Sequence, residues 1–289
     1  MRFAPRSFAG AASASRHNDE WRNGPLTLYS DPIGYERYMG RWSATLAPSF
    51  LRFACRDSPQ SLLDLGCGTG NLLRAAAEAF PRSSLFGIDL CVPFVDRARA
   101  TIGPPFPNYA IGRTEELPFA DNVFHHCLSL LLLQEIQDRA AALREMHRVT
   151  QEKGIVAACQ WDFENGMPMI AALHEALVAV APAVHDCARS GSARAFTGLQ
   201  ELETAWRSAG LEDVETARIP VTLSYVNFAD LWSPVLAGST PTTALVAALP
   251  AKTREAVGRK LSSIIPAAHH GCAFSLTAHA FAIRGRASQ

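Results

Sequence analysis

Residues 61–71 read Ser-Leu-Leu-Asp-Leu-Gly-Cys-Gly-Thr-Gly-Asn, and this stretch decides the fold. Two leucines lead into Asp64, then Gly66, Gly68 and Gly70 alternate with small residues, and a run typical of a helix follows. This order predicts a buried strand, a tight turn and a helix that begins at the turn. Glycine suits such a turn because the backbone bends sharply and a ligand must approach it closely. The free N–H groups at the helix start would face an electron-rich ligand, and Asp64 would face a cationic amine.

Two classes of ligand are bound by turns of this kind. The dinucleotide fingerprint has its third glycine three places after the second, whereas here the spacing is two and position 71 is Asn. The stretch instead resembles the first motif of class I S-adenosyl-L-methionine (SAM) methyltransferases, in which an acid precedes G-x-G-x-G. The resemblance implies that the acid fixes the ammonium group of SAM and that the turn admits its amino-acid end. The residues concerned are Asp64, Gly66, Cys67, Gly68 and Gly70.

The composition is that of a globular protein with a sizeable core. The chain has 289 residues, of which 48% are hydrophobic and 19% charged. Because Lys plus Arg equals Asp plus Glu, at 27 each, no overall field attracts nucleic acid or an acidic membrane. No apolar run approaches the roughly 20 residues that cross a bilayer. The seven cysteines are scattered without a C-x-x-C pair, which predicts buried free thiols, no metal site and a cytoplasmic location.

The first residues of the chain differ from the rest. Residues 1–23 contain arginines, alanines and serines and no acid before Asp19. This composition predicts a disordered tail or an upstream start site, and an organelle transit peptide is the alternative. Residues 24–289 are expected to form a single methyltransferase domain.

An aromatic and basic segment, YERYMGRWS, occupies residues 35–43. Tyr38, Trp42 and Leu46 are four apart, so they form an apolar stripe if the segment is helical. Alternatively, Tyr38 and Arg41 close over the cofactor, with Arg41 reaching its carboxylate. The segment resembles the opening of methyltransferases related to the ubiquinone and menaquinone enzymes, which leaves both interpretations open.

A second strand is expected over residues 84–89, which read SLFGID. Asp89 lies 25 residues beyond Asp64, about the length of a strand–helix–strand unit. Ligands of parallel α/β sheets bind at the carboxyl ends of strands. Asp89 is therefore predicted to accept hydrogen bonds from both ribose hydroxyls, with Leu90 beside it. The alternative is an acidic cap of the next helix, and one Asp can serve both purposes.

After a third strand near 108–111, residues 112–124 resemble the family's G-D-A-E-x-L-P-F segment, which passes the adenine. The resemblance implies cofactor contacts from Thr114 and Glu115. Arg113 stands where the family commonly has an Asp that accepts a hydrogen bond from the adenine amino group, and arginine has only donors. Either Glu115 substitutes for that acid, or Arg113 stacks on the ring, or cofactor affinity is reduced.

The fourth strand is predicted over 124–130, where His125 replaces the family's usual Asp. Adjacent strand residues point to opposite faces, so His125 and its neighbour His126 do not form a metal site. Ser129, near the strand end, is expected close to the cofactor. A helix over 138–149 and a fifth strand over 155–161 follow, and a later strand is expected over 211–225.

Two insertions are predicted to form a helical cap above the strand ends, at about 163–196 and 227–268. The first carries an apolar helix over 169–180, which is buried or lines an apolar pocket. The second carries a helix over about 242–265. Four aromatic side chains either wall an acceptor pocket or attach the cap to the core, namely Trp161, Phe163, Phe228 and Trp232.

The expected fold is α/β, a Rossmann-like, seven-stranded, mostly parallel sheet with helices on both faces. The resemblance implies an antiparallel edge strand from the C-terminus, over 272–283. The expected function is methyl transfer from SAM to a small, apolar or aromatic molecule, mainly by alignment in a dry pocket. A base is needed only if the acceptor must lose a proton, and Asp162 and His185 are the candidates.

Two other functions compete with this interpretation. Arg113 and His125 motivate a SAM-fold binding or regulatory protein without transferase activity. A nicotinamide oxidoreductase would need the dinucleotide fingerprint, and the glycine spacing argues against it.

Overall fold

The computed structural model describes residues 31–104, 107–183, 196–265 and 272–288. The predictions for residues 1–23 and for His185 lie outside these ranges. A single seven-stranded sheet runs through the described chain in the order β3-β2-β1-β4-β5-β7-β6. Its strands are β1 (Ser61–Leu65), β2 (Ser84–Asp89), β3 (Asn108–Ile111), β4 (Phe124–Leu130), β5 (Thr150–Trp161), β6 (Leu211–Tyr225) and β7 (Phe274–Ala287).

The sheet is mostly parallel, as predicted. Strands β1 to β5 pair in parallel, and β7 is antiparallel to both β5 and β6. The expectation that the C-terminal strand forms the edge is wrong, because β7 lies between β5 and β6. The side chains explain this order. Strand β7 carries small residues that are buried along much of its length, whereas β6 is largely exposed and contains Pro220, which suits an edge strand.

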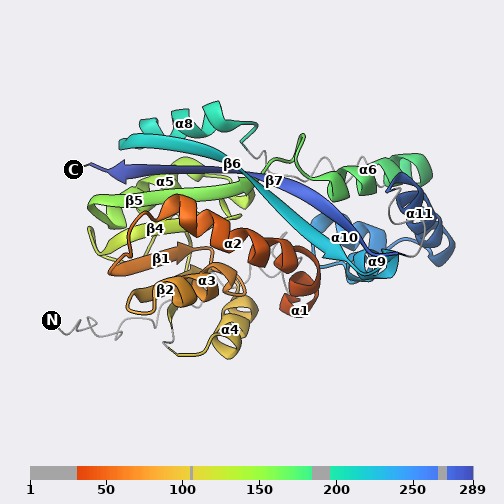
Figure 1. Ribbon diagram of the computed structural model, residues 1–289, viewed down its shortest axis with the longest axis horizontal. Coiled ribbons are helices and arrows are strands. Elements are labelled where there is room, and N and C mark those ends of the chain that lie inside the picture. The colour runs from red at the N-terminus through yellow and green to blue at the C-terminus, as the bar shows by residue number, and fades with distance from the viewer. Residues whose placement is uncertain (1–30, 105–106, 184–195, 266–271, 289) are drawn as a thin grey trace, which may run out of the picture.

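Helices cover both faces of the sheet (Figure 1). One face carries α1 (Pro32–Tyr35), the π-helix η2 (Glu36–Gly40), α2 (Arg41–Ala54), α3 (Asn71–Ala79) and α4 (Val92–Thr101). The other face carries α5 (Arg139–Val149) and α8 (Leu199–Ser208), and the short 3-10 helix η3 (Leu133–Glu135) follows β4. In Figure 1, α2 and α3 lie in front of the sheet and α5 lies behind it.

The alternation of side chains along β1 decides where Asp64 points. Leu62 belongs to the hydrophobic cluster under α2 and α3, while Leu63 and Leu65 belong to the cluster under α5 and α8. Because side chains alternate along a strand, Asp64 lies on the same face as Leu62. The carboxyl group therefore faces the side of the sheet on which α2 and α3 pack.

Four helices form a cap beyond one end of the sheet, at the right of Figure 1. They are α6 (Pro168–Val180), α9 (Phe228–Leu236), α10 (Pro241–Ala247) and α11 (Ala251–Ile264), and α6 packs on α11. The single helix predicted over 242–265 is wrong, because the chain breaks between α10 and α11 at Pro250. Proline lacks an N–H and disfavours helical geometry at the residue before it. None of the described helices is both long enough and apolar enough to span a membrane.

Candidate functional site

Three left-handed glycines shape the turn between β1 and α3. The φ angles of Gly66, Gly68 and Gly70 are +72°, +52° and +85°, in the left-handed region that residues other than glycine rarely adopt. A Cβ on Gly66 would lie 2.5 Å from Leu132, and one on Gly70 would lie 2.7 Å from Ile102. At Gly68 the nearest atom would be a ring carbon of Phe94, 3.8 Å away. Gly68 therefore leaves space beside the turn, as a close-approaching ligand requires.

Asp89 is fixed beside this turn by two backbone donors. Its Oδ2 accepts a hydrogen bond from Gly68 N at 2.8 Å, and its Oδ1 accepts one from Cys91 N at 2.8 Å. Burial raises the pKa of Asp89, and the hydrogen bonds from Cys91 and Gly68 oppose that shift. The bond to Cys91 reaches the N–H of the N-cap residue of α4, and no side chain caps the first turn of that helix, so the expectation that Asp89 is its cap is wrong. Leu90, the next residue, is 39% exposed on the surface beside the carboxylate.

Asp64 is the unusual group of the site. It is 1% exposed, and neither carboxylate oxygen has a hydrogen-bond partner among the residues that the structure describes. Burial raises its pKa well above the ordinary range, and the negative charge of Asp89 adds to the effect. A buried carboxylate without a partner is costly, and a cationic group beside it would offset that cost. The residues present therefore fit an ammonium group at this position.

A pocket opens at the carboxyl ends of β1 and β4. The glycine turn and Asp64 form its floor, and residues of the N-terminal helices form its roof. Burial raises the pKa of Tyr35 to about 12, so its hydroxyl stays protonated near neutral pH. The lining consists of Tyr35, Ser43, Asp64, Gly66, Cys67, Gly68, Thr69, Asn71, Leu72 and Leu130.

A wider cavity lies near the start of β5, at the opposite end of the strand from this pocket. Arg284 Nη2 lies 2.7 Å from Glu215 Oε1, and Arg56 Nη2 lies 2.8 Å from the same oxygen. Arg286 Nε lies 3.3 Å from Asp213 Oδ2. The arginines of this cavity are therefore paired with its own carboxylates, and we place the functional site at the glycine turn.

Sequence reasoning found only part of the lining. It named Asp64, Gly66, Cys67 and Gly68, and it missed Tyr35, Ser43, Thr69, Asn71, Leu72 and Leu130. Several of the missed residues belong to stretches that had already been singled out. Thr69 and Asn71 lie inside or next to the glycine motif, and Tyr35 and Ser43 begin and end the aromatic segment.

The structure places Tyr38 and Arg41 away from the pocket. Tyr38 is 5% exposed and packs in the core with Trp42 and Leu46, so the apolar stripe is confirmed. Arg41 pairs with Asp230 of α9 at 2.9 Å and lies over the ring of Tyr225. The π-helix explains the difference, because its wider turn shifts the helical register between Tyr35 and α2.

In the segment expected beside the adenine, the polar side chains hydrogen-bond to one another. Glu115 Oε1 accepts a hydrogen bond from Arg113 at 3.2 Å, and its Oε2 accepts one from Thr114 Oγ1 at 3.2 Å. Arg148 and Glu145 of α5 hold the same segment through backbone atoms of Leu117, with Leu117 N donating to Glu145 at 2.6 Å. Where the family commonly has an Asp that can accept a hydrogen bond from the adenine, this chain therefore has Arg113 in an ion pair with Glu115.

Ser129 and the histidines of β4 do not line the pocket. Ser129 is fully buried, and the next residue, Leu130, lines the pocket instead, because neighbouring side chains of a strand point to opposite faces. His125 Nδ1 lies 3.1 Å from Ser61 Oγ at the start of the strands, and burial lowers the pKa of His126. Among the described residues, no group of three His, Cys, Asp or Glu side chains could hold a metal ion.

The carboxylate of Asp162 has structural partners. Its Oδ1 accepts a hydrogen bond from Asn165 N at 2.9 Å, and its Oδ2 accepts one from Arg218 Nη2 at 3.0 Å. The side chain is only 4% exposed and does not line the pocket. Asp162 thus shapes the turn after β5 and ties it to β6, which leaves it poorly placed to act as a base.

Known proteins share both the sequence and the fold of this chain. Residues 63–158 match the Methyltransferase domain family. A demethylmenaquinone methyltransferase of Roseiflexus sp. is 31% identical over 202 residues, which cover 66% of this chain and 79% of that protein. A malonyl-[acyl-carrier protein] O-methyltransferase of Serratia marcescens is 35% identical over 97 residues, only 34% of this chain and 36% of that protein.

The fold is similar to that of phosphoethanolamine N-methyltransferase 2 of Haemonchus contortus, solved with phosphomonomethylethanolamine and S-adenosylhomocysteine. The TM-score is 0.55 at 16% identity, and the match covers 89% of this chain and 57% of that chain. The Roseiflexus relative matches over most of its length, and the glycine turn carries the buried acid typical of the group. The chain therefore belongs to the class I SAM-dependent methyltransferases, and SAM is its cofactor.

Proposed function

We propose that the protein transfers a methyl group from SAM to a small, apolar or aromatic acceptor. The observation that carries the proposal is the buried carboxyl group of Asp64, which has no partner among the described residues and faces the glycine turn. The ammonium group at the amino-acid end of the cofactor would satisfy it. The alignment of cofactor and acceptor would then supply most of the catalysis.

We assign the cofactor contacts residue by residue. Asp64 would hold the ammonium group, and the backbone of the glycine turn would hold the remainder of the amino-acid end. Asp89 would use its remaining lone pairs for the ribose hydroxyls, and the exposed side chain of Leu90 would lie against the adenine. Thr114 and Glu115 stay proposed neighbours of the adenine, with Glu115 engaged by Arg113.

Other side chains of the pocket would orient the reactants and exclude water. When bound, SAM supplies a methyl group made electrophilic by its sulfonium. Tyr35 would close the roof, and Leu72 and Leu130 would provide an apolar wall that keeps the site dry. Among the described residues that line the pocket, Asp64 is the only carboxylate, and it would be engaged by the cofactor. The chemistry therefore favours an acceptor whose nucleophile is already ionised near neutral pH, such as a carboxylate or an acidic phenol.

We infer an apolar acceptor from the composition of the cap. Helix α6 has no charged residue besides Glu175, and α6 packs on α11 above the end of the sheet. Trp161 is buried against Trp42, at 6.2 Å between ring centroids. Phe228 stacks on Trp232, and a Cβ on Gly258 of α11 would lie 3.0 Å from the Trp232 ring. Trp232 and Phe228 therefore pack within the cap, α9 against α11. We propose that the acceptor binds where the apolar side of the cap meets the carboxyl ends of the strands.

Calorimetry with S-adenosylhomocysteine (SAH) tests the cofactor site. We expect binding by the wild type and a loss of at least tenfold in Asp89→Asn, because hydrogen bonds to a charged group contribute about 1.5–3 kcal/mol each. Incubation with methyl-labelled SAM and a panel of phenols, demethylated quinols and malonyl thioesters then tests the acceptor. No SAH binding by the wild type would refute the proposal.

A SAM-binding protein without transferase activity is the second candidate. Two observations favour it, namely the Arg113–Glu115 pair at the adenine segment and the engagement of Asp162 by Arg218. Tight SAH binding without a labelled product from any acceptor class would support this alternative. A labelled product would exclude it.

A further inference from the structure

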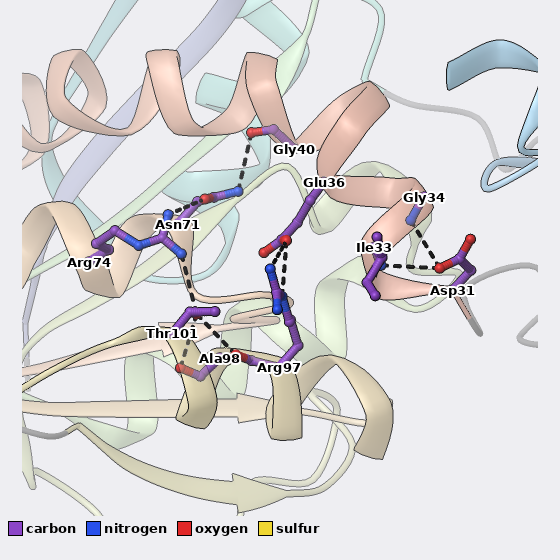
Figure 2. Close-up of polar contacts among 10 residues, drawn as sticks. All are labelled: Asp31, Ile33, Gly34, Glu36, Gly40, Asn71, Arg74, Arg97, Ala98 and Thr101. Carbon is purple, nitrogen blue, oxygen red and sulfur yellow. Dashed lines mark hydrogen bonds and ion pairs between the residues drawn. The ribbon is translucent and has the colours of Figure 1, made fainter. Parts of the chain in front are cut away.

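The segment of residues 31–40, called the cover here, lies over the cofactor pocket. It comprises α1 and η2, and it contributes Tyr35 to the roof. Its start is fixed by Asp31, whose Oδ1 accepts hydrogen bonds from Ile33 N at 3.1 Å and Gly34 N at 2.9 Å (Figure 2). Its second half is a π-helix, a conformation that is rare and often found at functional sites.

Asn71 joins the cover to the glycine turn. It follows Gly70 directly, begins α3 and lines the pocket. Its Nδ2 donates to Gly40 O at 3.3 Å and to Ser43 Oγ at 2.7 Å. Figure 2 shows the amide side chain between the end of the cover and Arg74, whose Nη1 donates to Asn71 Oδ1 at 2.9 Å. One side chain thus connects the floor of the pocket to its roof.

An ion pair fastens the cover at a second point. Glu36 Oε2 accepts hydrogen bonds from Arg97 Nη2 at 2.7 Å and from Arg97 Nε at 3.0 Å (Figure 2). Arg97 lies on α4, the helix that follows Asp89. Both contacts therefore reach helices that follow proposed cofactor-binding residues, since α3 begins directly after Gly70 and α4 begins three residues after Asp89.

The pocket beside Asp64 is small, about 40 Å³, while the cover stays in this position. Asp64 is 1% exposed, and both of its oxygens are buried. An amino-acid end that pairs with Asp64 must pass the roof, to which Tyr35 and Ser43 contribute. Tyr38 and Met39 anchor the end of the cover in the core. The start of the cover contacts α4 through the ring of Phe94 and the side chain of Arg97, which makes this half the part best suited to open.

We propose that Asn71 is a positioning residue that joins the cover to the glycine turn and so sets the rates at which SAM enters and leaves. The proposal rests on the cofactor site proposed above. When Asn71 holds Gly40 and Ser43, the roof stays over the bound amino-acid end. When these hydrogen bonds break, the cover opens and the cofactor passes. The Glu36–Arg97 pair acts in the same direction from the other side of the segment.

Stopped-flow measurement of SAH association and dissociation with the full chain tests the proposal. For Asn71→Ala we expect both rates to rise, with dissociation faster by on the order of tenfold, because the open state becomes more populated. Asn71→Asp should behave in the same way, since it keeps an acceptor for Arg74 but loses both donors to the cover. Asn108→Ala, which changes an exposed Asn of β3, serves as the matched control and should leave both rates unchanged.

A second ion pair on α4 provides a control for the Glu36–Arg97 pair. Glu36→Gln should raise both rates, by about two- to fivefold, because the pair is partly exposed. Asp96→Asn breaks the more exposed Arg99–Asp96 pair of α4 and should change neither rate. Hydrogen exchange of amides 35–43 should slow when SAH is added to the wild type and should be faster in Asn71→Ala without SAH.

The outcomes separate this inference from the proposed function. If the wild type binds SAH but Asn71→Ala keeps the wild-type association rate, or amides 35–43 exchange equally with and without SAH, the role of Asn71 is overturned and the cofactor site stands. If only the dissociation rate rises, Asn71 is a lining residue and the coupling to the cover is overturned. If the wild type binds no SAH, both proposals fall.

Discussion

Replacing Asp64 by Asn should stabilise the free protein and weaken cofactor binding, although the two side chains have almost the same shape. The carboxyl group is fully buried, and neither oxygen has a partner among the described residues. Burial and the charge of Asp89 raise its pKa in the folded protein. A carboxyl whose folded pKa is raised favours folding only below its unfolded pKa of about 3.9, and this advantage is lost as the pH rises toward the folded value.

The expected gain in stability of Asp64→Asn follows from the cost of burying the Asp64 carboxyl without a hydrogen-bond partner. An unsatisfied buried polar group costs about 1–3 kcal/mol, and more if it is charged. Because the amide introduced by Asp64→Asn would also lack partners, only part of this cost is recovered, on the order of 1–2 kcal/mol at pH 8. At about 2–4 °C per kcal/mol for a chain of this size, the Tm of the free protein should rise by roughly 2–8 °C.

Thermal unfolding with and without SAH measures both halves of the prediction. A ligand at 100 times its Kd stabilises the wild type by about 2.7 kcal/mol. Asp64→Asn loses the charged partner of the ammonium group, so its SAH affinity should fall about 10- to 100-fold. The wild type should therefore gain about 1.3–2.3 kcal/mol more from SAH than the variant, so the Tm advantage of Asp64→Asn should shrink when SAH is added and should reverse if the affinity loss is close to 100-fold. Below pH 5 the Tm difference between the free proteins should shrink.

Asp162→Asn provides the matched control. Asp162 is also buried, but its oxygens are engaged by Asn165 N and Arg218. Its replacement should lower the Tm and leave SAH affinity unchanged. A lower Tm for free Asp64→Asn, or an unchanged SAH affinity, would refute the reasoning about the unpaired carboxyl.

Three further predictions concern the same site. The SAH affinity of the wild type should fall as the pH is lowered from 8 to 5, because binding needs the ionised form of Asp64 and burial raises the pKa of that carboxyl. Calorimetry at a series of pH values measures the affinity, and a constant affinity would contradict the prediction. Arg113→Asp should tighten SAH binding by about two- to tenfold, because the new carboxylate adds a hydrogen-bond acceptor. The free energy of unfolding should change by no more than about 0.5 kcal/mol, because Arg113 is exposed. Weaker binding would show that the Arg113–Glu115 pair itself helps to bind the cofactor. Gly68→Ala should destabilise the fold by about 1–2 kcal/mol through its left-handed backbone and abolish SAH binding. Gly103→Ala, at an exposed position with open space and no left-handed backbone, should do neither in the same denaturation and binding assays.

Local patterns in the sequence were sufficient to predict the turn and the bounds of four strands, whereas β5 begins at Thr150, five residues before the predicted strand. Strands were expected over residues 84–89, 108–111, 124–130 and 211–225, and the structure has strands with these bounds. The alternation of the glycines predicted a sharp turn, and three positive φ angles confirm it. These features depend on neighbours within a few residues, so their physical causes are present in the sequence itself. The break at Pro250 was equally local, and it was overlooked.

The tertiary structure alone decided which side chains reach the pocket. Arg41 finds its partner Asp230 on the cap, and Asp162 finds Arg218 on the edge strand, and both pairings depend on how distant elements pack. Tyr35 rather than Tyr38 faces the pocket because a π-helix lies between Tyr35 and α2. A shift of one residue turns a helical side chain by about 100°, and one step along a strand turns it to the opposite face. The sequence therefore determined where the pocket at the glycine turn lies, and the packing of the helices decided which residues close it.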